Sequence, residues 1–353
     1  MFDKRDQKGK IITRKIQKTG GSSYVITLPK DWLNSIKTGG NDGDDELKGI
    51  ELGIILQPDN TLLITPNLSR ETLQRKKVIE LTPGTDSSYL FRYLVSSYIT
   101  GFTSIEVRGS IIPALRMVVR KFIQMVIGFE ILEEEESCLS LKDLLNPAEM
   151  PFENIIKQMS LIAKKMHMEA IQALKEANIH LASEISERDD DIDRLYWLVA
   201  RQTNMMLRDS NLEEKLGITA DLAANMFLIS RIIERIGDHA VRIAENVIIL
   251  QDQVIDGEII QRLETVSEIA LAAFDRSIEA LIEGNMLKAN ENIESVKEFE
   301  KKCEEITPLA RKQESRVAIS VDNIIESIRR IGEYAEDISE NVMNILARED
   351  DEF

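Results

Sequence analysis

The apolar positions of this chain change their spacing near residue 151. Before that point, short runs of alternating apolar and polar residues are mixed with helical patterns, which is typical of small β and α/β domains. After Pro151, Pro and Gly become rare and apolar residues recur every three or four positions over long stretches. This spacing predicts six helices, at residues 153–177, 180–209, 219–250, 258–283, 286–312 and 317–348.

These patterns predict a multidomain, mainly α protein. The first region reads as short strands with a hairpin, and the second mixes strands with two helices. The six long helices form two sets of three, which indicates two tandem three-helix bundles behind a small β head and a small α/β middle domain. The expected boundaries are residues 10–66, 70–147, 151–251 and 258–348.

The third helix of each set carries a similar sequence. RIIERIGDHAVRIAE at 231–245 and SIRRIGEYAEDISE at 327–340 share an I-G-[DE] core, and such self-similarity indicates a duplicated structural unit. Gly237 should let another backbone approach this helix closely. Its core stripe should consist of Ile232, Ile236, Ala240, Ile243 and Val247.

Acidic residues lie four positions apart on this helix and on the helix before it. Glu234 and Asp238 fall on the face opposite the core stripe, and Asp189 and Asp193 border the apolar stripe of the preceding helix. If the two helices are antiparallel neighbours, the pairs converge along one groove, where four carboxylates repel one another. Hard divalent cations would relieve that repulsion, because they prefer oxygen ligands.

Ion pairs on a solvated helix face are the alternative explanation of these acids. Arg231, Arg235 and Arg242 flank the acids at helical spacing and could pair with them equally well. His239 is expected to be a packed or surface residue rather than a ligand. No phosphate-binding loop, dinucleotide fingerprint or nucleophile motif is present, so we expect no enzymatic activity.

The acidic pair at 189–193 and the sequence ERIGDHAVRIAE at 234–245 resemble the PhoU family of phosphate-signalling regulators. The resemblance covers about residues 152–348. It implies two three-helix bundles with acidic pairs that hold iron, zinc or another divalent metal ion on the bundle surface. The implied ligands of the first repeat are Asp189, Asp193, Glu234 and Asp238.

The second repeat departs from this pattern. Arg329 stands where the first repeat has Glu234, so a ligand has become a cation. An ungapped comparison of the preceding helices puts Val296 in the place of Asp189. A shift of one turn would instead put Glu300 and Glu304 in the places of the two aspartates. A second metal site therefore requires a rearranged ligand set, whose candidates are Glu300, Glu304, Glu333 and Asp337.

Charge is distributed unevenly along the chain. The net charge is −17, yet residues 1–30 hold eight Lys and Arg against two Asp, which indicates a nucleic-acid or other polyanion contact at that end only. The sequence RKIQKTGGSSYVITLPKDWL resembles the AbrB/SpoVT type of DNA-binding domain over about residues 11–66. The resemblance implies a swapped-hairpin homodimer whose DNA contacts are Lys10, Arg14, Lys15 and Lys18.

These features together predict a cytoplasmic, DNA-binding regulator of phosphate uptake with a PhoU-like sensor region. Two cysteines without a C-x-x-C pair argue against a disulfide framework, and no apolar run is long enough for a membrane span. Two alternatives stay open. The head could be a dimerisation module of a PhoU-like protein that docks on a phosphate transporter or sensor kinase, or the carboxylates could serve metal storage.

Overall fold

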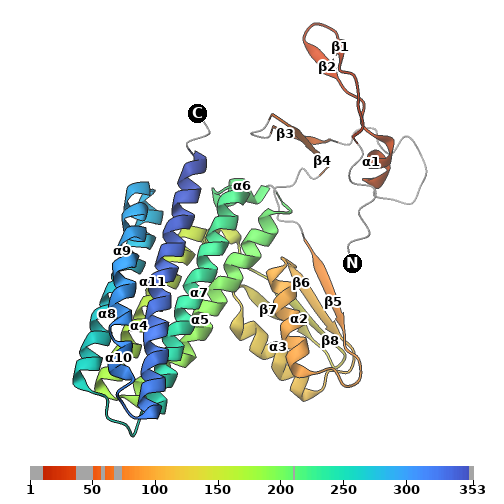
Figure 1. Ribbon diagram of the computed structural model, residues 1–353. Helices are drawn as coiled ribbons and strands as arrows, with labels where there is room; N and C mark the ends of the chain where they lie inside the picture. The colour runs from red at the N-terminus through yellow and green to blue at the C-terminus, as the bar shows by residue number, and fades with distance from the viewer. Residues whose placement is uncertain (1–10, 37–50, 57–59, 67–73, 210, 350–353) are drawn as a thin grey trace. The chain divides into compact units, whose positions relative to one another are not determined.

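The chain divides into two units, residues 1–71 and residues 72–353. The computed structural model, shown in Figure 1, describes residues 11–36, 51–56, 60–66, 74–209 and 211–349. The first unit contains two antiparallel hairpins and one short helix: β1 (Gln17–Thr19), β2 (Ser23–Val25), α1 (Lys30–Ser35), β3 (Gly53–Leu56) and β4 (Leu62–Thr65).

No described residue of the first unit is buried. Tyr24 on β2 and Ile54 and Leu56 on β3 are among the large apolar side chains that face outward, so the described residues of this unit enclose no core of their own. Within the described residues, β1 pairs with β2 only over Gln17–Thr19.

The second unit begins with a mixed four-stranded sheet and two helices. Its elements are β5 (Lys76–Glu80), α2 (Ser87–Ile99), β6 (Ser104–Arg108), α3 (Pro113–Met125), β7 (Phe129–Glu134) and β8 (Cys138–Asp143). β5 is parallel to β6, whereas β8 lies between β6 and β7 and is antiparallel to both. The sequence patterns did not predict β8. Its alternating Leu139 and Leu141 are buried in the sheet, but the sequence patterns predicted no strand after the acidic run at 133–136.

The helices α2 and α3 cover one face of this sheet (Figure 1). Leu90 and Leu94 of α2 and Phe122 of α3 are fully buried against the apolar side chains of the strands. The period-two alternation of the strands places their other side chains on the opposite face. There Lys76 and Arg108 form ion pairs with Glu106.

The rest of the second unit is helical. Its helices are α4 (Phe152–Glu176), α5 (Ile179–Met206), α6 (Asn211–Leu216), α7 (Ala220–Ile249), α8 (Gly257–Glu283), α9 (Met286–Glu304), α10 (Thr307–Ala310) and α11 (Ser315–Glu349). The six long helices begin and end within a few residues of the predicted ones, except that the helix expected at 286–312 is interrupted. Pro308 lies in the first turn of α10, and a proline cannot continue a helix because it lacks an N–H.

The long helices form two bundles that share one continuous core. α4, α5 and α7 pack together, as do α8, α9 and α11, and the two sets meet through α7 against α11 and α4 against α8. Asn178, Thr219 and Asn285 cap the starts of α5, α7 and α9 by accepting backbone hydrogen bonds. Among the described residues, no helix is long and apolar enough to cross a membrane.

One buried arginine joins the α/β domain to the first bundle. Arg201 on α5 has 2% of its side chain exposed, and its Nη2 lies 2.5 Å from Oδ2 of Asp143 on β8. Its Nη1 donates a hydrogen bond of 2.6 Å to the backbone oxygen of Tyr98. The guanidinium also lies 4.8 Å from the ring centre of Tyr98 and 5.1 Å from that of Phe129. The pair is therefore enclosed by aromatic rings from the α/β core.

Asp143→Ala should lower the free energy of unfolding by about 3–5 kcal/mol, because it leaves the Arg201 guanidinium buried without a counter-charge. Urea unfolding followed by circular dichroism measures the loss. Glu130→Ala, an exposed acid on the neighbouring strand β7, is the matched control and should change stability by less than about 0.5 kcal/mol.

Arg201→Met combined with Asp143→Ala should be less destabilising than the sum of the two single changes, because the double variant buries no unpaired charge. If the two losses in the free energy of unfolding are additive, the two residues stabilise the protein independently. The ion pair would then not be what joins the α/β domain to the bundle.

Candidate functional site

The close approach of α5 and α7 defines the site. The helices are antiparallel, since Gly237 lies against Ile192 at one level while Thr203 donates to the backbone oxygen of Ala223 at another. A Cβ added to Gly237 would lie 2.7 Å from Cδ1 of Ile192 and 3.6 Å from Oδ1 of Asp189. The glycine therefore admits a side chain of α5, and not a second backbone as we expected from the sequence.

This approach brings the four carboxylates of the first repeat together. Burial, followed by the charge of Asp193, raises the pKa of Asp189 to about 6. Burial and the charge of Asp238 raise the pKa of Asp193 to about 6 and that of Glu234 to about 7. Burial also raises the pKa of Asp238, although Arg231 and other arginines act in the opposite direction. The predicted convergence of the two acidic pairs is thus present in the structure.

Glu234 is buried, which corrects the expectation that it lies on the outer face of the bundle. Only 7% of the residue is exposed, because Glu234 lies on the side of α7 that packs against α5, where the charges of Asp193 and Asp189 act on it. Its Oε1 accepts a hydrogen bond of 2.6 Å from Nη1 of Arg231. Its Oε2, like Oδ1 of Asp189, is buried and has no hydrogen-bond partner in the part of the chain that the structure describes. The ion-pair alternative therefore explains Oε1 of Glu234. It does not explain the other two oxygens, whose burial without a hydrogen bond costs free energy.

Four carboxylates offer only oxygen ligands, which suit a hard divalent cation. The two buried oxygens without hydrogen-bond partners could bind such a cation. However, no three His, Cys, Asp or Glu side chains within the described ranges are arranged so that they could hold a metal ion. The four carboxylates are close enough to repel one another but do not form a ready coordination shell.

The second repeat reproduces the helix contact. The ring of Phe299 on α9 fits against Gly332 on α11, just as Ile192 fits against Gly237. This pairing supports the ungapped comparison of the two repeats. The side chain in the place of Asp189 is therefore Val296, which is buried.

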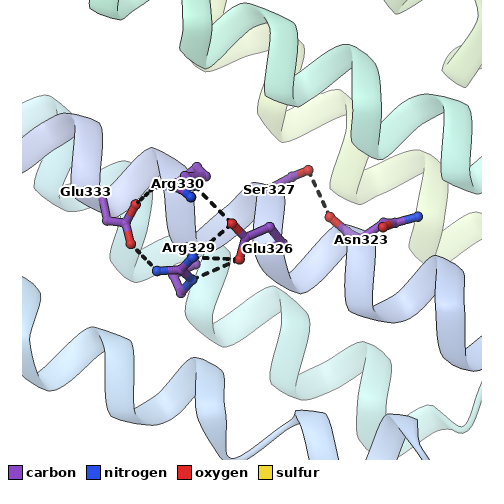
Figure 2. Close-up of polar contacts among 6 residues, drawn as sticks. All are labelled: Asn323, Glu326, Ser327, Arg329, Arg330 and Glu333. Carbon is purple, nitrogen blue, oxygen red and sulfur yellow. Dashed lines mark hydrogen bonds and ion pairs between the residues drawn. The ribbon is translucent and has the colours of Figure 1, made fainter.

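The acids of the second repeat are arranged differently (Figure 2). Arg329 donates hydrogen bonds to Glu326 and to Glu333, and Arg330 bonds the same two glutamates. Two of the predicted ligands, Glu300 and Glu304, line a pocket of about 300 Å³ beside Arg329. In this repeat the two arginines neutralise Glu326 and Glu333, so the ion-pair alternative describes these two acids better.

Asp337, the remaining candidate of the second repeat, has a raised pKa because of burial and then the charges of Glu340 and Glu333. The sequence comparison missed the role of Glu326, which holds Arg329 by a double hydrogen bond. Its spacing of three residues before Arg329 was the available signal.

The basic residues of the head are exposed. Arg14 and Lys15 precede β1, and Lys18 lies on it. Lys10, the fourth predicted DNA contact, lies outside the described residues. Of the histidines, His239 is buried with its ring centre 5.7 Å from that of Tyr334, which agrees with its expected role as a packed residue.

Two tandem three-helix bundles with a carboxylate groove define the class of this helical region. Residues 156–247 and 263–342 match the sequence model of the PhoU domain. Both bundles of the chain are thus PhoU-like, and the predicted resemblance to the PhoU family is confirmed for this part of the protein. The matched segments begin at residue 156, so the AbrB/SpoVT resemblance of the head stays a prediction.

Similar proteins support the same assignment. The chain is 32% identical over 133 residues to "Phosphate-specific transport system accessory protein PhoU homolog 1" of Thermotoga maritima, covering 38% of this chain and 54% of that protein. It is 32% identical over 124 residues to the protein of the same name from Methanothermobacter thermautotrophicus, covering 35% of this chain and 53% of that protein. The chain therefore spans about half the length of these curated relatives.

A solved structure shows the same fold. The crystal structure of PhoU from Pseudomonas aeruginosa aligns with a TM-score of 0.50 over 56% of this chain and 96% of that chain, at 19% identity. At this identity, the likeness concerns the fold of the helical region.

In the presence of a chelator, the free energy of unfolding should fall as the pH rises from about 5 to about 8. The folded-state pKa values of about 6 for Asp189 and Asp193 and about 7 for Glu234 exceed those of unfolded carboxyls, near 4. The folded state therefore binds more protons than the unfolded state in this range, and raising the pH favours unfolding. Urea unfolding at a series of pH values measures the slope.

Asp189→Asn with Asp193→Asn should flatten this slope and stabilise the protein at the higher pH. The control changes two exposed acids of the same helix, Glu187→Gln with Asp191→Asn, and should keep the wild-type slope. Equal slopes in all three proteins would mean that the carboxylates do not interact.

Proposed function

We propose that this chain regulates phosphate uptake as an accessory of a phosphate transport system, and that its PhoU-like bundles dock on the transporter or on a sensor kinase. The match of both bundles to the PhoU domain carries this proposal. Two relatives whose names contain "Phosphate-specific transport system accessory protein" support it.

The α5–α7 carboxylates would hold a divalent metal ion such as iron or zinc in this proposal. The ligands would be Asp189, Asp193, Glu234 and Asp238, because their oxygens repel one another and two of them lack partners. When bound, the ion supplies positive charge that offsets four carboxylates. The charge that the groove presents to a docking partner would then depend on metal occupancy.

Removal of the gene should alter the rate of phosphate uptake when phosphate is plentiful, and the wild-type gene should restore the original rate. Asp189→Asn with Asp238→Asn should restore it poorly, since these changes remove two charges from the groove without enlarging any side chain. Uptake of radiolabelled phosphate measures the effect. Unchanged uptake in the strain that lacks the gene would overturn the proposed function.

Glu234→Ala with Asp238→Ala should abolish metal binding in elemental analysis of protein loaded with iron, zinc or manganese, while the helical circular dichroism is retained. The matched change in the second repeat, Glu333→Ala with Asp337→Ala, should leave most of the metal bound, because Arg329 and Arg330 already neutralise Glu333. Wild-type protein that binds no metal would favour ion pairs in both repeats. Many ions per chain would favour the metal-storage alternative.

DNA binding by a dimeric head is the second candidate function, and the charge of the head favours it. Arg14, Lys15 and Lys18 are exposed in an otherwise acidic chain. Apolar strand residues such as Ile54 and Leu56 are also exposed, and a second copy that interleaves its hairpins would bury them. A dimer would also double the basic surface that meets the phosphates.

Arg14→Ala, Lys15→Ala and Lys18→Ala together should weaken binding to duplex DNA of any sequence. Each lost phosphate contact should flatten the dependence of log affinity on log salt by about 0.9 unit. Mobility shift at several salt concentrations measures both effects. Light scattering should show the same dimer mass for the variant and the wild type, since these side chains are exposed. Wild-type protein without DNA affinity at low salt would make the head a dimerisation module only.

A further inference from the structure

The outer surface of α2 and α3 is free of acidic residues. Neither Ser87–Ile99 nor Pro113–Met125 contains an Asp or a Glu, although the whole chain carries a net charge of −17. Arg92 projects from the outward side of α2, opposite the buried Leu90, Leu94 and Tyr98. The acids of this domain lie on the strands, at the cap of α2 and in the turn between β7 and β8.

Three cations lie on or beside this surface, and two of them lie close to aromatic rings. Nζ of Lys77 on β5 lies 5.1 Å from the ring centre of Tyr93 on one flank of α2. Nζ of Lys121 on α3 lies 5.6 Å from the ring centre of Phe91 on the other flank. Neither these lysines nor Arg92 form an ion pair with any residue that the structure describes. By contrast, Arg116 and Arg120 of α3 are already paired with Glu134.

Exposed apolar side chains stand among the cations. Tyr89 is 57% exposed one turn before Tyr93, and Met117 is 65% exposed one turn before Lys121. The α2–α3 face, defined as Lys77, Tyr89, Arg92, Met117 and Lys121, therefore combines unpaired positive charge with apolar groups of moderate size. This combination is typical of protein surfaces that meet the headgroup layer of an anionic membrane.

We propose that the α2–α3 face binds a membrane surface rich in anionic phospholipids. Two observations favour this partner over nucleic acid. A lysine lies close to the ring centre of Tyr93 and another close to that of Phe91, so one face of each ring is not free for a base to stack on. The two helices also lie side by side on one sheet, and such a layer fits a flat surface better than a groove.

The proposal goes beyond transporter docking, because it needs no protein partner. Vesicles without protein therefore test it separately from the proposed function. The starting protein is the full chain with Arg14→Ala, Lys15→Ala and Lys18→Ala, so that the basic head contributes less; every further variant is compared with this protein. It should float with vesicles that contain about 30 mol % phosphatidylglycerol and not with pure phosphatidylcholine, since the attraction depends on anionic headgroups.

Adding Arg92→Glu and Lys121→Glu to this protein should reduce its partition to the anionic vesicles at least about tenfold. The matched control adds Lys301→Glu and Lys302→Glu, two exposed lysines of α9, and should retain the partition because it changes only the net charge. Tyr89→Ser with Met117→Ser should also weaken the partition. Far-ultraviolet circular dichroism confirms that each variant is folded.

Three results would overturn the proposal. The starting protein could fail to float with anionic vesicles at low salt. The control could lose as much binding as the Arg92 and Lys121 variant, which would reduce the effect to net charge. Finally, the Arg92 and Lys121 variant could lose binding to duplex DNA while its partition to vesicles stays unchanged. That result would assign the face to nucleic acid.

Discussion

The contact of one helix with a glycine of its neighbour positions everything that this protein presents at its candidate site. Ile192 of α5 fits against Gly237 of α7, and a Cβ at 237 would lie 2.7 Å from Cδ1 of Ile192, so the Ile192 side chain would have to shift. The same close approach brings Asp189 within reach of the acids on α7, so packing and charge repulsion are linked. The groove holds four carboxylates at a cost that the surrounding apolar core must offset.

The two bundles share this contact but use it for different chemistry. Phe299 against Gly332 repeats the packing of Ile192 against Gly237. Around it, Arg329 replaces Glu234, and the acids nearby bond to arginines instead of facing one another (Figure 2). The two repeats have therefore kept the same packing, whereas the charge at the position of Glu234 has changed sign in the second repeat.

Charge is distributed unevenly along the second unit, and a buried ion pair is one of the contacts that join the α/β domain to the first bundle. Arg201 connects α5, the helix that carries two of the site's acids, with Asp143 of the α/β domain. On that domain, α2 and α3 carry basic residues and no acids, whereas the strands carry residues of both charges. The acidic groove and the basic α2–α3 face thus belong to one connected body and are suited to partners of opposite charge.

The sequence by itself determined the six long helices, their division into two repeats and the identity of the acids, because helical periodicity and the spacing of i and i+4 residues are local properties. It also predicted the hairpins of the head and most of the α/β domain, but it missed β8, whose pairing with β6 joins segments distant in the sequence. Only the tertiary structure decided that Glu234 is buried, that Ile192 fills the space left by Gly237 and that Arg201 finds its partner on β8. Burial and partner choice depend on how the elements pack against one another, and the spacing of residues within a single helix does not contain that information.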